Sequence, residues 1–77
     1  MATTRQIGLY DIVELLEPID AAPAGAQGAV IEFLRDGTVA EIELTEPKFD
    51  DVLDSIVYAR LDKLRVIKPH SESAGQR

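Results

Sequence analysis

The dipeptide Asp36-Gly37, with strand-like sequence on both sides, constrains the fold of this chain more than any other feature. Asp-Gly is the strongest short-range signal for a β-hairpin, because a type I′ turn needs positive φ at both central residues. Residues 38–44 then alternate in polarity, which indicates a half-buried antiparallel strand. Its inward residues would be Ala40, Ile42 and Leu44, and its outward residues Glu41 and Glu43.

The segment before the turn, residues 29–35, is rich in β-branched and aromatic residues and is predicted to be the partner strand. Its two faces are Ala29, Ile31 and Phe33 on one side and Val30, Glu32 and Leu34 on the other. If the first face fills the core, Val30 and Leu34 are exposed beside a carboxylate.

The stretch LYDIVELLE, residues 9–17, fits two structures. Its apolar residues have the spacing of an amphipathic helix and also fit a buried strand; they are Leu9, Ile12, Val13 and Leu16. An all-β body of this size needs one more strand to avoid a long exposed edge. We therefore predict a strand over residues 12–16 with a turn at 9–11.

Proline and glycine mark the remaining loops, and β-branched and aromatic residues mark the remaining strands. In the loop at 18–28, Gly25 and Gly28 are predicted to supply positive φ or a tight entry into the next strand. Residues 56–61 are predicted to be a strand, followed by a tight turn at 62–64 and a closing strand at 65–67. In the first of these strands Val57, Ala59 and Leu61 would point inward, and Ile56, Tyr58 and Arg60 outward.

Residues 45–55 are either a short helix or a loop. Thr45 is a candidate N-cap with Pro47 in the first turn, and helical spacing is seen at Phe49, Val52, Leu53 and Ile56. A helix this short is marginal in water, so it would have to be held by packing.

The chain has 77 residues and no cysteine, which predicts one small domain without disulfides or thiolate metal sites. We expect the domain to span residues 7–68, with flexible ends at 1–6 and 69–77. Apolar runs are too short to cross a bilayer and no leader opens the chain, so a cytoplasmic, bacterial-type protein with no membrane contact is expected.

Charge is distributed unevenly around a net value of −6. Residues 1–54 carry 12 acidic and 3 basic side chains, whereas residues 55–77 carry 2 acidic and 5 basic ones. An acidic surface repels phosphate, so nucleic-acid binding is disfavoured for the molecule as a whole.

The order of the pieces LYDIVELLE, GAQGAVIEF, DGTVAEIEL and YARLDKLRVI resembles the bacterial family catalogued as domain of unknown function 4926. The resemblance covers residues 9–67 and departs from the family pattern at GAQG and at TEPKFDDVLDS. It implies a small five-stranded barrel of the Src-homology-3-like type and no activity. Because members of that family tend to be encoded near toxin-like genes, the resemblance also suggests an antitoxin or immunity role. The small acidic protein would then cap a basic partner, such as a toxin-like product of a neighbouring gene.

The sequence offers no convincing catalytic or cofactor site. Its single histidine, His70, lies in the polar tail and is expected to be solvated, and GAQG lacks the lysine of a phosphate-binding loop. On a helix, Asp50 and Asp54 would share a face and have the oxygen ligands that Mg²⁺ prefers. A solvated face is the preferred interpretation, so no cofactor or metal is predicted.

These observations predict a non-enzymatic module that binds a partner protein or associates with itself. The predicted contact patch combines aromatic, apolar, basic and acidic residues: Phe49, Leu53, Tyr58, Arg60, Asp50, Asp51 and Asp54. Alternatively, Phe49 and Leu53 plug the open end of the barrel. The alternative function is nucleic-acid binding through the basic C-terminal third, by Arg60, Lys63, Arg65 and Lys68.

Overall fold

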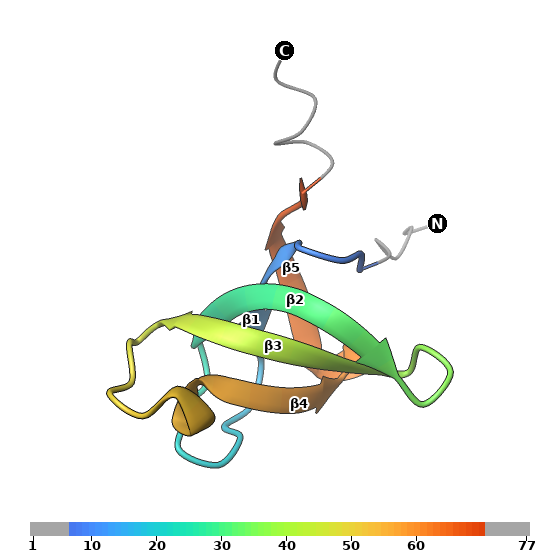
Figure 1. Ribbon diagram of the computed structural model, residues 1–77. Helices are drawn as coiled ribbons and strands as arrows, with labels where there is room; N and C mark the ends of the chain where they lie inside the picture. The colour runs from blue at the N-terminus through green and yellow to red at the C-terminus, as the bar shows by residue number, and fades with distance from the viewer. Residues whose placement is uncertain (1–6, 71–77) are drawn as a thin grey trace.

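The computed structural model describes residues 7–70 and contains one five-stranded antiparallel sheet (Figure 1). The strands are β1 (Ile12–Leu15), β2 (Gln27–Leu34), β3 (Val39–Glu46), β4 (Ile56–Arg60) and β5 (Leu64–Lys68), with two short 3-10 turns, η1 (Val52–Ser55) and η2 (Leu61–Lys63). They pair in the order β4-β3-β2-β1-β5. The predicted all-β class is confirmed, and the elements within residues 7–69 include no α-helix. The predicted flexible ends at 1–6 and 69–77 lie outside the described residues, except for Pro69 and His70.

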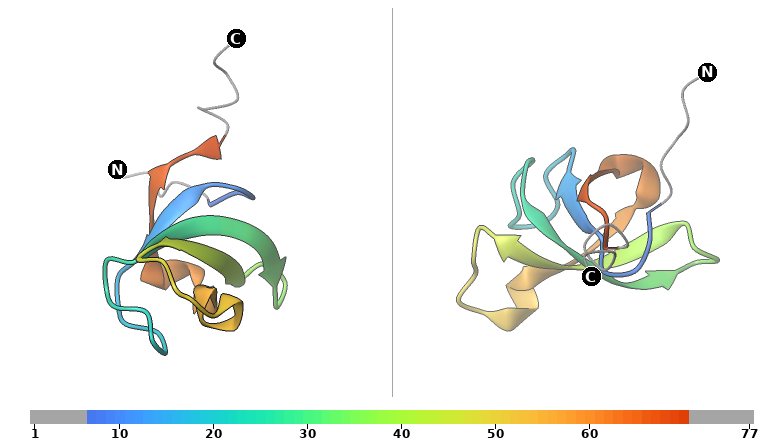
Figure 2. Two further views of the ribbon diagram at one scale, coloured as in Figure 1. Left: turned by 60° about the vertical axis from the view of Figure 1, so that its left-hand side comes forward. Right: turned by 90° about the horizontal axis from the view of Figure 1, so that it is seen from above.

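The sheet folds so that β2, β3 and β4 make a front layer, with β1 and β5 crossing behind it (Figures 1 and 2). Strand β1 joins the two layers because it pairs with both β2 and β5. Its Val13 and Leu15 are buried at a spacing of two, while Leu16 is exposed. The ambiguity in LYDIVELLE is therefore resolved as the predicted strand, since a helix would have buried one side of every turn.

The inward and outward faces of β3 and β4 are as predicted, except that Leu61, expected inward on the fourth strand, lies in η2 and is half-buried. Ala40, Ile42 and Leu44 are buried on β3, and Val57 and Ala59 on β4. The remaining buried apolar residues complete one core cluster: Val13, Leu15, Ala22, Ala26, Val30 and Leu64.

The predicted faces of β2 are partly wrong, and a β-bulge is the reason. Val30, expected outside, is fully buried, whereas Ile31, expected inside, is only half-buried. Val30 pairs with Ile42 but Glu32 pairs with Glu41, so Ile31 is an extra residue in the ladder. One extra residue shifts the alternation of the strand. No signal in the sequence indicated where that residue would fall.

The hairpin forms as predicted, but its turn lies one residue earlier than Asp36-Gly37. The amide of Gly37 donates to the carbonyl of Leu34 at 3.0 Å, which makes Arg35 and Asp36 the central residues. Both have positive φ, at 53° and 57°. Gly37 follows with a φ of 86° and completes a longer loop between the strands.

Glycine in the GAQG loop has the two structural roles expected of it. Gly25 has a φ of 90°. Gly28 lies where β2 and β3 approach closely: a Cβ there would be 2.7 Å from the Cα of Leu44 and closer still to the carbonyl oxygen of Glu43. A side chain at this position would collide with backbone that cannot move aside.

The helix considered for residues 45–55 does not form. Thr45 belongs to β3, and the helical element found within residues 45–55 is the 3-10 turn η1, whose N-cap is Asp51. Pro47 lies in the loop between β3 and η1 rather than in a first helical turn. A 3-10 turn places side chains differently from an α-helix, so Val52 and Leu53 do not join Phe49 on a buried face.

The start of the C-terminal tail is anchored through its backbone, although His70 itself is exposed as predicted. The buried carboxylate of Asp11 accepts hydrogen bonds from the backbone amides of Gly8 at 2.8 Å and His70 at 2.7 Å. The ring of His70 meets that of Tyr10 edge-on, with centroids 5.5 Å apart. Asp11 thus joins the segment before β1 to the segment after β5.

Candidate protein-binding surface

The most exposed large hydrophobic side chains of the described residues lie together on η1. Val52 is 67% exposed and Leu53 77% exposed. The turn that carries them is held at both ends: Asp51 Oδ1 accepts from the Leu53 amide at 2.9 Å, and Ser55 Oγ donates to the Val52 carbonyl at 2.6 Å. Two apolar side chains are therefore presented to solvent on a turn that is already ordered.

Phe49 and Leu53 were predicted either to contact a partner or to plug the open end of the barrel, and each explanation fits one of them. Phe49 is half-buried and packs against the core, as a plug would. Leu53 points outward with its neighbour Val52. Three aspartates of the same loop, Asp50, Asp51 and Asp54, are exposed around them. We call Val52, Leu53 and these aspartates the η1 tip.

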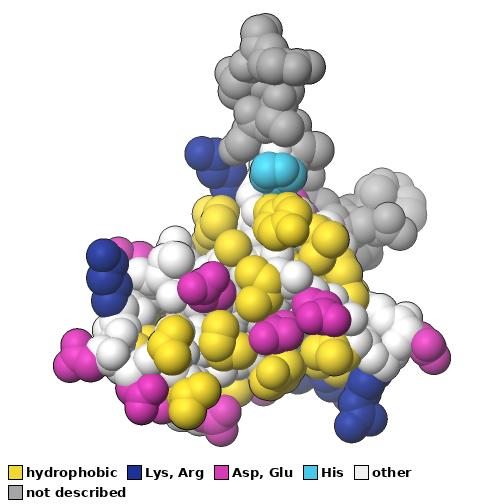
Figure 3. All heavy atoms as spheres, viewed as in Figure 1, with side chains coloured by type: hydrophobic (Ala, Val, Ile, Leu, Met, Phe, Trp, Pro, Cys, Tyr) yellow, Lys and Arg dark blue, Asp and Glu magenta, His cyan; other side chains and the backbone are white. Residues whose placement is uncertain are grey.

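The η1 tip adjoins an outward sheet surface that is partly apolar and acidic. Turn η1 packs against β3 and β4. We call the outward side chains of β2, β3 and β4 the front face, on which hydrophobic and acidic side chains are interspersed (Figure 3). The ladders place Glu41 opposite Tyr58 and Glu43 opposite Ile56. Tyr58 is 55% exposed, so an aromatic ring is available to a partner.

Charge on the front face is uncompensated within the described chain. Glu32, Glu41 and Glu43 make no ion pair with any residue between 7 and 70. The side chain of Glu32 lies across the ladder from that of Glu41. Like charges directly opposite each other destabilise a sheet.

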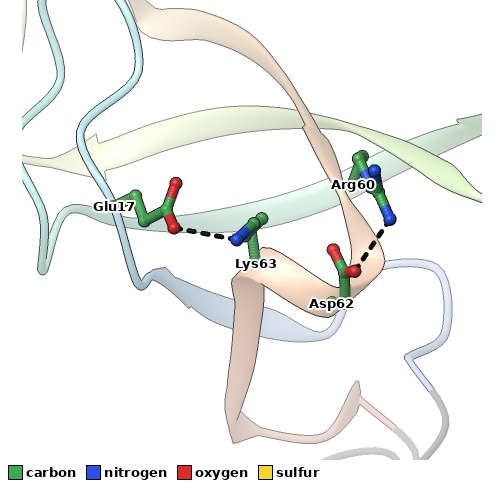
Figure 4. Close-up of polar contacts among 4 residues, drawn as sticks. All are labelled: Glu17, Arg60, Asp62 and Lys63. Atoms are coloured by element: carbon green, nitrogen blue, oxygen red, sulfur yellow. Dashed lines mark hydrogen bonds and ion pairs between the residues drawn. The ribbon is translucent and has the colours of Figure 1, made fainter.

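The cations proposed for nucleic-acid binding are, by contrast, mostly paired. Arg60 contacts Asp62 at 2.9 Å and Lys63 contacts Glu17 at 2.8 Å (Figure 4). The hydrogen bond from the Lys63 ammonium to Glu17 raises the pKa of that ammonium above its ordinary value.

The third pair joins the two back strands, where Arg65 donates to Glu14 Oε1 from both Nη2, at 2.6 Å, and Nε, at 3.1 Å. Of the four basic residues, Lys68 alone has no ion pair among the described residues. The basic third of the sequence is therefore largely neutralised by carboxylates of the same molecule.

Arg60 has the predicted position, but its surroundings separate it from the predicted contact patch. It is outward on β4 and two residues from Tyr58, as expected, but its guanidinium turns to Asp62. It lines an open hollow of about 650 Å³ beside the β2–β3 turn, together with Arg35, Thr38, Val39 and Leu61. The predicted patch thus separates into the η1 tip with Tyr58 and a hollow that holds Arg60.

No group of three or more histidine or carboxylate side chains within residues 7–70 is placed to hold a metal ion. Of the pair considered for Mg²⁺, Asp54 lies within the 3-10 turn η1 and Asp50 in the loop before it, so they do not share an α-helical face. No helix in this part of the chain is long and apolar enough to cross a membrane.

Sequence reasoning missed the parts of the surface that depend on strand register. Glu32 was assigned to an outward face, but its position opposite Glu41 follows from the bulge at Ile31. The exposure of Val52 was not predicted, since its spacing also fitted a short packed helix. The available signal was Asp51-x-x-Asp54, since aspartate is a preferred cap at the start of short turns.

Comparison of the chain with protein-family models, with curated proteins and with solved structures found no match.

Proposed function

We propose that this protein is a non-enzymatic module that binds a partner protein through the η1 tip and the adjoining front face. The observation that carries the proposal is the exposure of Val52 and Leu53 on a turn fixed by side-chain hydrogen bonds. Exposed apolar side chains favour association because binding removes them from water. A turn that is ordered beforehand loses little conformational entropy when it binds.

Charge defines the kind of partner. The η1 tip and the front face present aspartates and glutamates that have no counter-ion among the described residues, so a partner with a basic surface is favoured. An antitoxin or immunity protein that caps a basic toxin is the specific form of this proposal. It includes a cytoplasmic location, for which the absence of cysteine is suitable.

The proposed architecture is a partly closed barrel of the Src-homology-3-like type. The pairing of β1 with both β2 and β5 supports it, as does the single 3-10 turn between β4 and β5. Such a barrel would leave the loop that carries the η1 tip free at one end.

Nucleic-acid binding is the weaker candidate because Arg60, Lys63 and Arg65 are ion-paired. A phosphate would have to displace an intramolecular carboxylate at each of them. We expect no binding to single- or double-stranded RNA or DNA at about 50 mM salt, where phosphate contacts are strong. Binding there with a steep salt dependence would reverse the order of the two candidates.

The direct test is co-expression with the product of the neighbouring gene, followed by isothermal titration calorimetry of the purified partners. Leu53→Ser should weaken the complex about tenfold or more, because a central apolar side chain contributes about 1.4–2 kcal/mol to such an interface. Leu16→Ser is the matched control, since Leu16 is also an exposed leucine but lies directly after β1, outside the proposed binding surface. Equal affinities for the two variants, or no complex with wild type, would contradict the proposal.

A further inference from the structure

The front face contains a row of three side chains that the proposed function leaves unexplained. Glu32 on β2 pairs with Glu41 on β3, and Glu41 pairs with Tyr58 on β4. Directly opposed residues on one face of a sheet have Cβ atoms about 4.5–5.5 Å apart. Glu41 is therefore the immediate neighbour of the Glu32 carboxylate on one side and of the Tyr58 ring on the other.

The β-bulge at Ile31 creates this row. An unbroken ladder from the Val30–Ile42 pair would have placed Ile31 opposite Glu41 and would have turned Glu32 away. The bulge instead brings a second carboxylate beside the first, which opposes folding by charge repulsion. Bulges commonly redirect side chains at binding sites.

No cation of the described chain neutralises the row. The outward cation on the same strand as Tyr58 is Arg60, whose guanidinium is 2.9 Å from Asp62. Glu41 is half-buried by its neighbours yet makes no ion pair with a residue between 7 and 70. A carboxylate that has lost part of its hydration gains more from a bound cation than a fully solvated one.

We propose that the front face binds an arginine side chain of the partner protein, with the guanidinium over Glu41, paired with Glu32 on one side and stacked on the ring of Tyr58 on the other. This inference rests on the proposed protein-binding function and specifies the chemistry of its partner.

Arginine fits the row better than lysine because its planar guanidinium presents several donors in a fixed geometry and also stacks on an aromatic face. Its aliphatic stem would lie along Ile31, the extra residue of the bulge and half-buried. A second copy of this chain is disfavoured as the occupant, since an isologous contact of the front face would bring carboxylates against carboxylates.

The test uses the full chain labelled with ¹⁵N and two blocked tripeptides, N-acetylated and C-amidated Leu-Arg-Leu and Leu-Lys-Leu. The arginine peptide should shift the amide signals of Glu32, Glu41 and Tyr58 with a Kd in the millimolar range. Glu41→Gln and Tyr58→Leu should each weaken it about fivefold, and the lysine peptide should bind more weakly than the arginine peptide to wild type.

Asp20→Asn is the matched control, because it removes one negative charge from the exposed loop between β1 and β2. It should leave the Kd of the arginine peptide within a factor of about two. Removing a like charge from the row should also keep the urea midpoint of Glu41→Gln at or above that of wild type, which separates lost binding from lost folding. Equal affinities for the two peptides, or equal effects of Glu41→Gln and Asp20→Asn, would overturn the inference.

Failure of the two proposals is distinguishable in the complex with the neighbouring gene product. If Leu53→Ser weakens the complex but Glu41→Gln does not, the arginine site is refuted while the protein-binding function stands. If no complex forms although the arginine peptide binds at the row, the proposed partner is wrong while the arginine site stands.

Discussion

Replacing Asp11 with asparagine tests the contact that joins the two ends of the described chain. The Asp11 carboxylate is 6% exposed and uses one oxygen for the amide of His70 and the other for that of Gly8. Asparagine keeps one acceptor oxygen but replaces the other with an amide donor. One of the two backbone amides would then face a donor and lose its partner.

The expected destabilisation follows from these two hydrogen bonds. Loss of a charge-assisted bond costs about 1.5–3 kcal/mol, and the remaining bond weakens because its acceptor is neutral. We expect a total of about 2–4 kcal/mol, a large part of the roughly 5–15 kcal/mol that small domains possess. With a urea m-value of about 1–1.5 kcal/mol per molar, the midpoint should fall by about 2 M.

Urea denaturation followed by circular dichroism measures the effect, with Asp20→Asn as the control. The Asp20→Asn substitution makes the same chemical change in an exposed loop. It should alter the free energy of unfolding by less than about 0.5 kcal/mol. Hydrogen exchange supplies a second readout, because the amides of Gly8 and His70 should lose protection in the Asp11 variant. Equal midpoints for the two variants, with both amides still protected, would refute the role assigned to Asp11.

Three further predictions concern β2, the hairpin turn and a surface ion pair. Gly28→Ala should destabilise the protein by about 1–3 kcal/mol in urea denaturation, because its Cβ would collide with the β3 backbone. Gly8→Ala is the control and should be tolerated, because the nearest neighbour of a Cβ at Gly8 is 3.7 Å away. Arg35→Gly should raise the urea midpoint, since Arg35 holds a φ of 53° that glycine adopts without steric cost; an unchanged midpoint would argue against strain there. The pKa of Lys63 is raised by Glu17, so the small stability from this pair should be complete below the ordinary lysine pKa and lost as pH rises through the raised value. Titration by NMR should show a lower Lys63 pKa in Glu17→Gln, and an unchanged value would contradict the assignment.

Local sequence determined the secondary structure of this protein wherever periodicity and turn chemistry agree. The alternation of Ala40, Ile42 and Leu44 with two glutamates specified the faces of β3, because a strand places successive side chains on opposite sides. The Asp-Gly pair located the hairpin to within one residue. LYDIVELLE needed the rest of the chain, since its own spacing suits a helix as well as a strand.

Tertiary structure alone decided the register of the strands and which charged side chains form ion pairs. The bulge at Ile31 depends on how β2 fits β3 along its length, and it reverses the predicted side of Val30 and moves Glu32 next to Glu41. The pairs of Lys63 with Glu17 and Arg65 with Glu14 join residues far apart in the chain. Hydrophobic periodicity describes one strand at a time, whereas register and ion pairing depend on two strands at once. Only the folded sheet therefore shows which acidic side chains of the described residues remain unpaired.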